Sequence, residues 1–150
     1  MHEVRSLKHF EDIYHQLKNP RFDYLSSSKK YNMSSSPAGH YSSSFVSGKL
    51  IFSSGVLPIL NRETKEVDPD ISKQCMLVLE RLEAIFEEHG LSRKDIIKTT
   101  CYISDGNDWG VVNGIYAKFF GDHKPARSII PVSTLHYGCK IEIEAIAELP

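Results

Sequence analysis

Two charged side chains in the last third of this chain are of types that can bind and hydrolyse a small organic acid. Arg127 begins a strand-like segment, and Glu142 lies in the later alternating segment Ile141–Ala145. A guanidinium holds a carboxylate through two parallel hydrogen bonds, and a carboxylate nearby can orient and activate a water molecule. The pair therefore suggests a hydrolytic site for a small organic acid.

Both residues also have ordinary explanations. Most arginines are exposed or ion-paired, and an acid on the polar side of an alternating strand is usually solvated. Glu142, Glu144 and Glu148 share one face of the expected strand, so alternation does not choose among them. If Arg127 lies close to Glu142, we expect it to lower the pKa of that carboxyl and to keep it ionised near neutral pH.

Length and composition are those of one globular domain. The 150 residues carry a formal net charge of -1, which argues against nucleic acid or an anionic membrane as a partner. No apolar run approaches a membrane span, and the N-terminus lacks the apolar core of a secretory signal. The cysteines at 75, 101 and 139 form neither a zinc motif nor a disulfide framework, so we expect a cytoplasmic protein.

No metal or cofactor is expected. The seven histidines show no metal-ligand spacing with an acid or cysteine partner. The chain has no glycine-rich phosphate loop and no dinucleotide fingerprint, and no motif supports a nucleophilic serine or cysteine triad.

The first 35 residues read as an extension that precedes the main domain at 36–150. An apolar stripe at residues 3–18 predicts an amphipathic helix, which Asn19-Pro20 ends, and a polar loop follows. A stripe of this kind favours packing on the core or on a neighbouring subunit. A lid or a partner-binding helix is the alternative.

In the main domain, the hydrophobic periodicity predicts an α+β fold. Strands are expected at 43–46, 49–54, 96–103, 127–134 and 140–149, with a hairpin turn at Ser47-Gly48, a loop at 61–70, a helix from Asp70 to Gly90 and a second helix from Asn107 or Asp108 to Gly121. The strict alternation of the last strand places one apolar row on the helix side of a sheet. Ile146 lies on the other side, which favours burial of that face against further copies of the chain.

Six short segments, in order and at near-family spacing, resemble the reactive-intermediate deaminase family (Rid, or YjgF-like). The resemblance runs from about Ser36 to Leu149. The segments are Gly39-His40-Tyr41-Ser42, Ser53-Ser54-Gly55-Val56-Leu57-Pro58, Ile97-Lys98-Thr99-Thr100, Val112-Asn113-Gly114-Ile115-Tyr116, Pro125-Ala126-Arg127-Ser128 and Ile141-Glu142-Ile143-Glu144-Ala145-Ile146-Ala147. The resemblance implies a chorismate-mutase-like α+β fold, with a mixed sheet and two helices on one face. It also implies a homotrimer with a site at each subunit interface.

The same resemblance implies the roles of individual residues. Arg127 would hold the substrate carboxylate, Glu142 would bind the catalytic water, and the Tyr41 hydroxyl would point at the reacting group. Further substrate contacts would come from Ser54, Gly55, Asn113 and the backbone around Ile129. The proton would pass from water to Glu142 and then to the leaving ammonia.

The function implied is hydrolytic deamination of short 2-imino or enamine acids of the 2-aminoacrylate/2-iminopropanoate type, which gives a 2-keto acid and ammonia. One alternative is a non-catalytic trimer that binds a carboxylate metabolite. A ribonuclease or translation inhibitor is less favoured, because no basic stripe alternates with aromatic residues. The departures from the family pattern at His40, Val56, Ile129 and His136-Tyr137 bear on the substrate more than on the chemistry.

Overall fold

The structure, a computed structural model, describes residues 39–150. The helix predicted at 3–18 and the boundary predicted at residue 36 lie outside the described residues. No helix in the described part is long and apolar enough to cross a membrane.

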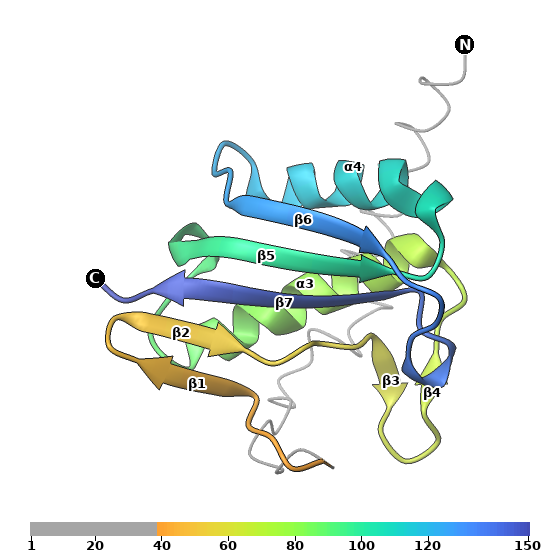
Figure 1. The fold of residues 1–150 in the computed structure, drawn as a ribbon, viewed down its shortest axis with the longest axis horizontal. Coiled ribbons are helices and arrows are strands. Elements are labelled where there is room, and N and C mark those ends of the chain that lie inside the picture. Colours follow the sequence, from red (N-terminus) through yellow and green to blue (C-terminus); the bar gives the residue numbers. More distant parts are fainter. Residues whose placement is uncertain (1–38) are drawn as a thin grey trace, which may run out of the picture. The chain divides into compact units, whose positions relative to one another are not determined.

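A five-stranded mixed sheet forms the centre of the fold (Figure 1). Its spatial order is β1 (Ser44–Ser47), β2 (Leu50–Ser53), β7 (Ile141–Glu148), β5 (Ile96–Ile103) and β6 (Ala126–Pro131). All neighbouring pairs are antiparallel except β5 and β6, which run parallel. Parallel neighbours need a long crossover, and the helix between these two strands supplies it. The predicted α+β class is therefore confirmed.

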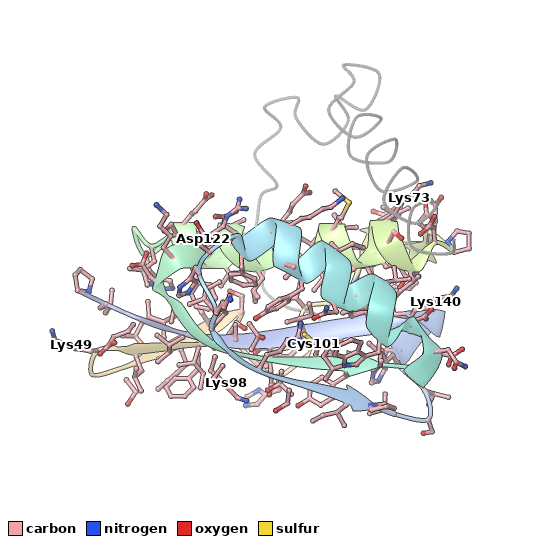
Figure 2. The ribbon with its side chains drawn as sticks, turned by 90° about the horizontal axis from the view of Figure 1, so that it is seen from above. Lys49, Lys73, Lys98, Cys101, Asp122 and Lys140 are labelled. Carbon is pink, nitrogen blue, oxygen red and sulfur yellow. The ribbon has the colours of Figure 1, made fainter. Side chains whose placement is uncertain are left out.

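Two helices cover one face of this sheet, as Figures 1 and 2 show for α3 (Ile71–Glu87) and α4 (Trp109–Phe120). The predicted cap of the first helix is present, since the Asp70 carboxylate accepts a hydrogen bond from the Ser72 amide at 2.7 Å. The chain leaves the helices through glycines with positive φ, 75° at Gly90 and 61° at Gly121.

The second helix begins directly after Asp108, one of its two predicted starts, although the Asp108 side chain makes no capping bond. Asp105 caps the short η3 helix (Gly106–Asp108) by accepting from the Asn107 amide. Two local predictions were wrong. The first hairpin turns at Gly48 and Lys49, one residue later than expected, because Gly48 takes the positive φ. The strand expected at 127–134 ends at Pro131.

The segment expected as a loop at 61–70 contributes to a small second sheet. In it β3 (Ile59–Asn61) pairs with β4 (Glu66–Val67). The Arg81 guanidinium of α3 donates to the carbonyl oxygens of Leu57 and Ile59, at 2.9 and 2.7 Å. These bonds hold the start of the hairpin against the helix layer. An anchor from a distant arginine leaves no periodic pattern in the hairpin's own residues, so the sequence did not indicate it.

The two faces of the main sheet differ in what covers them. Figure 2 shows Cys101 between the sheet and the helices, whereas Lys98, three residues earlier on β5, extends from the opposite face. The helix-covered face carries the buried core. The second face, called the open face below, exposes Phe45 (67%), Phe52 (38%) and Ile130 (41%) within the described chain.

Candidate active site

Arg127 lies on β6 against the helix layer. Its Nη2 donates to the Asn113 side-chain oxygen on α4 at 2.9 Å, the only hydrogen bond of this guanidinium within residues 39–150. Arginine has five N–H donors in a fixed fork. One bond to Asn113 therefore sets the direction of the fork and leaves donors for a ligand carboxylate.

Two aromatic rings lie beside the same guanidinium. Its carbon is 4.6 Å from the Tyr116 ring centroid and 5.9 Å from that of Trp109, both within cation–π range. The Tyr116 hydroxyl is 2.9 Å from the buried Thr99 hydroxyl, which fixes the ring. Neither Trp109 nor Tyr116 was among the residues expected at the site from the sequence. The signal was their spacing from Asn113, because residues three and four apart share a helix face.

The backbone of Ile129 is oriented toward the free edge of β6. Val132 donates its amide to the Ile103 carbonyl at 2.8 Å, on the β5 side. Backbone groups alternate sides along a strand, so the amide and carbonyl of Ile129 point away from β5. Pro131 also lies at an outward position, which suits a residue with no N–H. The predicted backbone contact at Ile129 is sterically available at this edge.

Glu142 is the second residue of β7 and packs against Gly55. Val56 and Ile143 form a two-way backbone bridge next to them, at 2.9 and 3.2 Å. A Cβ atom at position 55 would overlap Glu142 Oε1. Glycine is therefore required here by the close approach of the carboxylate to the backbone.

Gly55→Ala is expected to displace the Glu142 carboxylate. Because an added methyl group would overlap Oε1, the glutamate must rotate or the backbone must shift. If Glu142 acts as expected from the sequence, kcat should fall by at least about 10-fold, since misplaced catalytic groups lose rate steeply. Steady-state kinetics measures this, with Gly110→Ala as the control because no atom lies within 4 Å of a Cβ there. Unchanged kcat in Gly55→Ala would show that the carboxylate position does not matter.

Burial raises the pKa of Glu142, and Glu144 raises it further, while His136 acts in the opposite direction. Arg127 is not among the groups that shift this pKa within the chain, so the condition for its expected effect, a position close to Glu142, is not met there. A raised pKa moves the carboxylate toward neutrality, which suits a group that must accept and return a proton.

Glu142→Gln is expected to stabilise the fold at neutral pH. The folded-state pKa lies above the unfolded value, so the folded chain binds the proton more tightly and loses stability as pH rises through this range. Glutamine carries no charge to desolvate. We expect the melting temperature of the variant to exceed that of wild type at about pH 7.5 and the gap to close near pH 4. Thermal unfolding by circular dichroism tests this, with the exposed Glu63→Gln as control.

Arg127 and Glu142 lie on opposite faces of the sheet. Arg127 is the register partner of Thr99, and Glu142 is the register partner of Tyr102. Paired residues project to the same face and successive residues alternate, so Thr99 and Tyr102, three apart on β5, project oppositely. Within one chain the two groups therefore do not converge, and the expected interface site would have to draw them from different subunits.

Ser54 and Tyr41, the other two predicted residues, flank β2 and β1, and β2 is the strand next to β7 in the sheet. Ser54 precedes Gly55, and its hydroxyl donates to the Ser42 carbonyl at 2.6 Å. Tyr41 is 58% exposed in the segment that leads to this carbonyl, and no described contact joins it to Arg127 or Glu142. We call Arg127, Asn113 and Ile129 the arginine half of the site. Glu142, Gly55, Ser54 and Tyr41 are the glutamate half.

The cysteines contribute no nucleophile. Cys75, Cys101 and Cys139 are buried and free. Burial raises the pKa of all three thiols, that of Cys101 to about 11, so they stay protonated at neutral pH. Residues 39–150 also contain no group of three or more potential metal ligands from His, Cys, Asp and Glu.

Comparison with known families identifies the chain. A family model described as endoribonuclease L-PSP matches residues 33–149. The chain belongs to this family, the Rid or YjgF-like proteins. The resemblance seen in the six sequence segments is thereby confirmed.

Several members of the L-PSP family are similar over most of their length. A 2-iminobutanoate/2-iminopropanoate deaminase of Escherichia coli K12 is 44% identical over 103 residues, which cover 67% of this chain and 80% of the relative. A RutC family protein of Pyrococcus horikoshii is 43% identical over 111 residues, covering 74% and 88%.

Solved structures of the L-PSP family share the fold described above. The E. coli YjgF gene product has a TM-score of 0.69 at 40% identity, covering 75% of this chain and 91% of that one. E. coli TdcF, solved with bound serine, has a TM-score of 0.70 at 38% identity, covering 77% and 92%. The agreement supports the mixed sheet and helix layer that position the two halves of the candidate site.

Proposed function

We propose that this L-PSP family protein is a hydrolytic deaminase of short 2-imino acids and their enamine tautomers, of the 2-aminoacrylate/2-iminopropanoate type. The products are a 2-keto acid and ammonia. The observation that carries the proposal is the fixed guanidinium of Arg127, held by Asn113 and two aromatic rings with donors left for a carboxylate. The name of the E. coli relative at 44% identity supports the same substrate class.

The carboxylate of the substrate binds the fork of Arg127, and the outward amide of Ile129 adds a donor at the same edge of β6. A planar fork pairs with a carboxylate through two parallel hydrogen bonds. The substrate is thereby oriented with its C2 carbon at a fixed place relative to the edge strand. Positioning of this kind supplies much of the rate for a reaction whose carbon is already electrophilic.

Glu142 then relays two protons during hydrolysis. It accepts a proton from water as the water oxygen bonds to C2 of the imine, and it gives this proton to the imine nitrogen, which forms a carbinolamine. The hydroxyl proton of the carbinolamine then passes through Glu142 to the same nitrogen, the C–N bond breaks, and ammonia leaves as the C2 carbonyl forms. The enamine form first takes a proton at C3 and loses one from nitrogen to become the imine. The raised pKa of Glu142 supports both the acceptance and the return of the proton.

Each complete site is built from two chains of a homotrimer. Arg127 and Glu142 project from opposite faces of one sheet, so one substrate reaches both only if they come from different copies. The exposed Phe45, Phe52 and Ile130 on the open face support the burial of that face by association. Sedimentation equilibrium tests the assembly, and a monomer at micromolar concentration would contradict it.

The activity is tested by generating 2-aminoacrylate in situ and following release of the keto acid. We expect the protein to accelerate release and its rate to scale with protein concentration. No acceleration over the spontaneous hydrolysis would contradict the proposal.

Subunit mixing tests the shared site. Arg127→Ala and Glu142→Gln are each inactive by this proposal, because each removes one half of every site. In trimers reassembled from equal amounts of both variants, roughly one site in four combines an intact Arg127 with an intact Glu142. We expect a corresponding fraction of wild-type activity to return. No recovery in confirmed mixed trimers would show that both groups act from the same chain.

A non-catalytic role in binding carboxylate metabolites is the second candidate, and the serine bound to E. coli TdcF supports it. The arginine half alone suffices for this function. If the protein only binds metabolites, Glu142→Gln should keep the ligand affinity, and there is no turnover to measure. If it is a deaminase, the same variant should lose turnover. Ribonuclease activity, which the family description names, is disfavoured by the net charge of -1.

A further inference from the structure

One stripe of α4 surrounds the guanidinium of Arg127. Trp109, Asn113 and Tyr116 are spaced by four and three residues, so they lie above one another on the side of the helix that faces β6. The hydrogen bond to Asn113 places the guanidinium at the middle turn, with one ring a turn before it and one a turn after it.

The two rings differ in exposure. Tyr116 is 7% exposed and its hydroxyl is bonded to Thr99, so its ring serves to hold the guanidinium from the core side. Trp109 begins the helix and is 49% exposed in the described chain. A large half-exposed indole next to a ligand-binding guanidinium offers free apolar surface where a bound carboxylate's own substituents would lie.

We propose that Trp109 is a specificity-determining residue that favours 2-imino acids with apolar side chains larger than methyl. The inference rests on the proposed function and names the substrate class of that site. A carboxylate on the Arg127 fork has C2 one bond away and the side chain two bonds away. The Trp109 ring, whose centroid is 5.9 Å from the guanidinium carbon, is then within reach of that side chain.

Arg127 and Trp109 have separate consequences for binding. The guanidinium interacts with the carboxylate that every 2-imino acid shares, so it does not discriminate among them. The indole interacts with the part that varies, and each buried methylene in such a contact changes kcat/KM by roughly 10-fold or more. Discrimination among 2-imino acids therefore depends on the Trp109 ring, and the affinity common to all of them depends on the Arg127 guanidinium.

The test compares two imines generated in situ from alanine and leucine by an amino-acid oxidase. We expect Trp109→Ala to lower kcat/KM for the leucine-derived imine by about 10-fold or more, and that for the alanine-derived imine by no more than about 3-fold. Trp109→Phe should retain most of the preference because it keeps an aromatic face. Leu60→Ala, which removes an exposed apolar side chain from β3, is the matched control and should leave the ratio unchanged.

Equal loss for both imines in Trp109→Ala would overturn the inference, because the ring would then act only by positioning Arg127. An unchanged ratio would overturn it as well. Calorimetric binding of pyruvate and of 4-methyl-2-oxopentanoate gives the same comparison without turnover.

If wild type hydrolyses neither imine, the proposed function fails. A ratio of the two dissociation constants that shifts in Trp109→Ala would then still support the role of the indole, and an unchanged ratio would overturn it.

Discussion

Arg127→Ala is expected to reduce kcat/KM for 2-imino acids by roughly 10²- to 10³-fold, mainly through a higher KM. Removing one partner of a hydrogen-bonded charge pair costs about 2–5 kcal/mol, and Arg127 is the cation that Asn113 holds in place beside α4. Steady-state kinetics with the alanine-derived imine measures the effect. Calorimetric titration with pyruvate should show the matching loss of affinity.

The controls separate charge from geometry. Arg127→Lys keeps the charge but loses the fork, so we expect it to recover only part of the affinity. Arg62→Ala removes an exposed arginine from the β3–β4 turn and should keep the wild-type KM. Wild-type kinetics in Arg127→Ala would rule out the carboxylate clamp, provided that circular dichroism shows an intact fold.

Glu142→Gln is expected to lower kcat by about 10²- to 10⁴-fold while the affinity for a keto acid stays near that of wild type. The amide cannot accept the proton of the attacking water, and a positioned general base contributes a factor of this size. The variant keeps the volume of the side chain beside Gly55, so packing is preserved. Single-turnover kinetics and calorimetric titration separate the two quantities.

Glu144→Gln is the matched control for this variant. Glu144 projects from the same face two residues later, where its carboxylate accepts a hydrogen bond from the Tyr102 hydroxyl at 3.1 Å. Because both acids project to the same face of β7, the alternation does not distinguish them, and only the groups around each carboxylate differ. We expect Glu144→Gln to keep kcat within about 3-fold of wild type. A larger loss there than in Glu142→Gln would reassign the base.

Much of the architecture could be predicted from local patterns. The apolar repeat of α3 and the alternation of β7 are strong because each element buries one continuous row of side chains. The hairpin of β3 and β4 was missed because its two strands are only three and two residues long. Its anchor, Arg81, lies in a different part of the sequence.

The placement of the catalytic pair could not be predicted in the same way. Alternation within one strand gives relative faces, but the relation between Arg127 on β6 and Glu142 on β7 depends on how both align with β5. This register is fixed by packing and turn geometry across the whole sheet. The lowering of the Glu142 pKa that was expected beside Arg127 depends on this same placement; within the chain, burial raises the pKa, His136 lowers it and Glu144 raises it.

The separation of Arg127 and Glu142 by the thickness of a sheet makes turnover sensitive to dilution. By the proposed mechanism, a lone chain has the carboxylate-binding Arg127 on one face of the sheet and the proton-transferring Glu142 on the other. Specific activity should therefore fall once the protein concentration drops below the dissociation constant of the assembly, and should return on concentrating the sample.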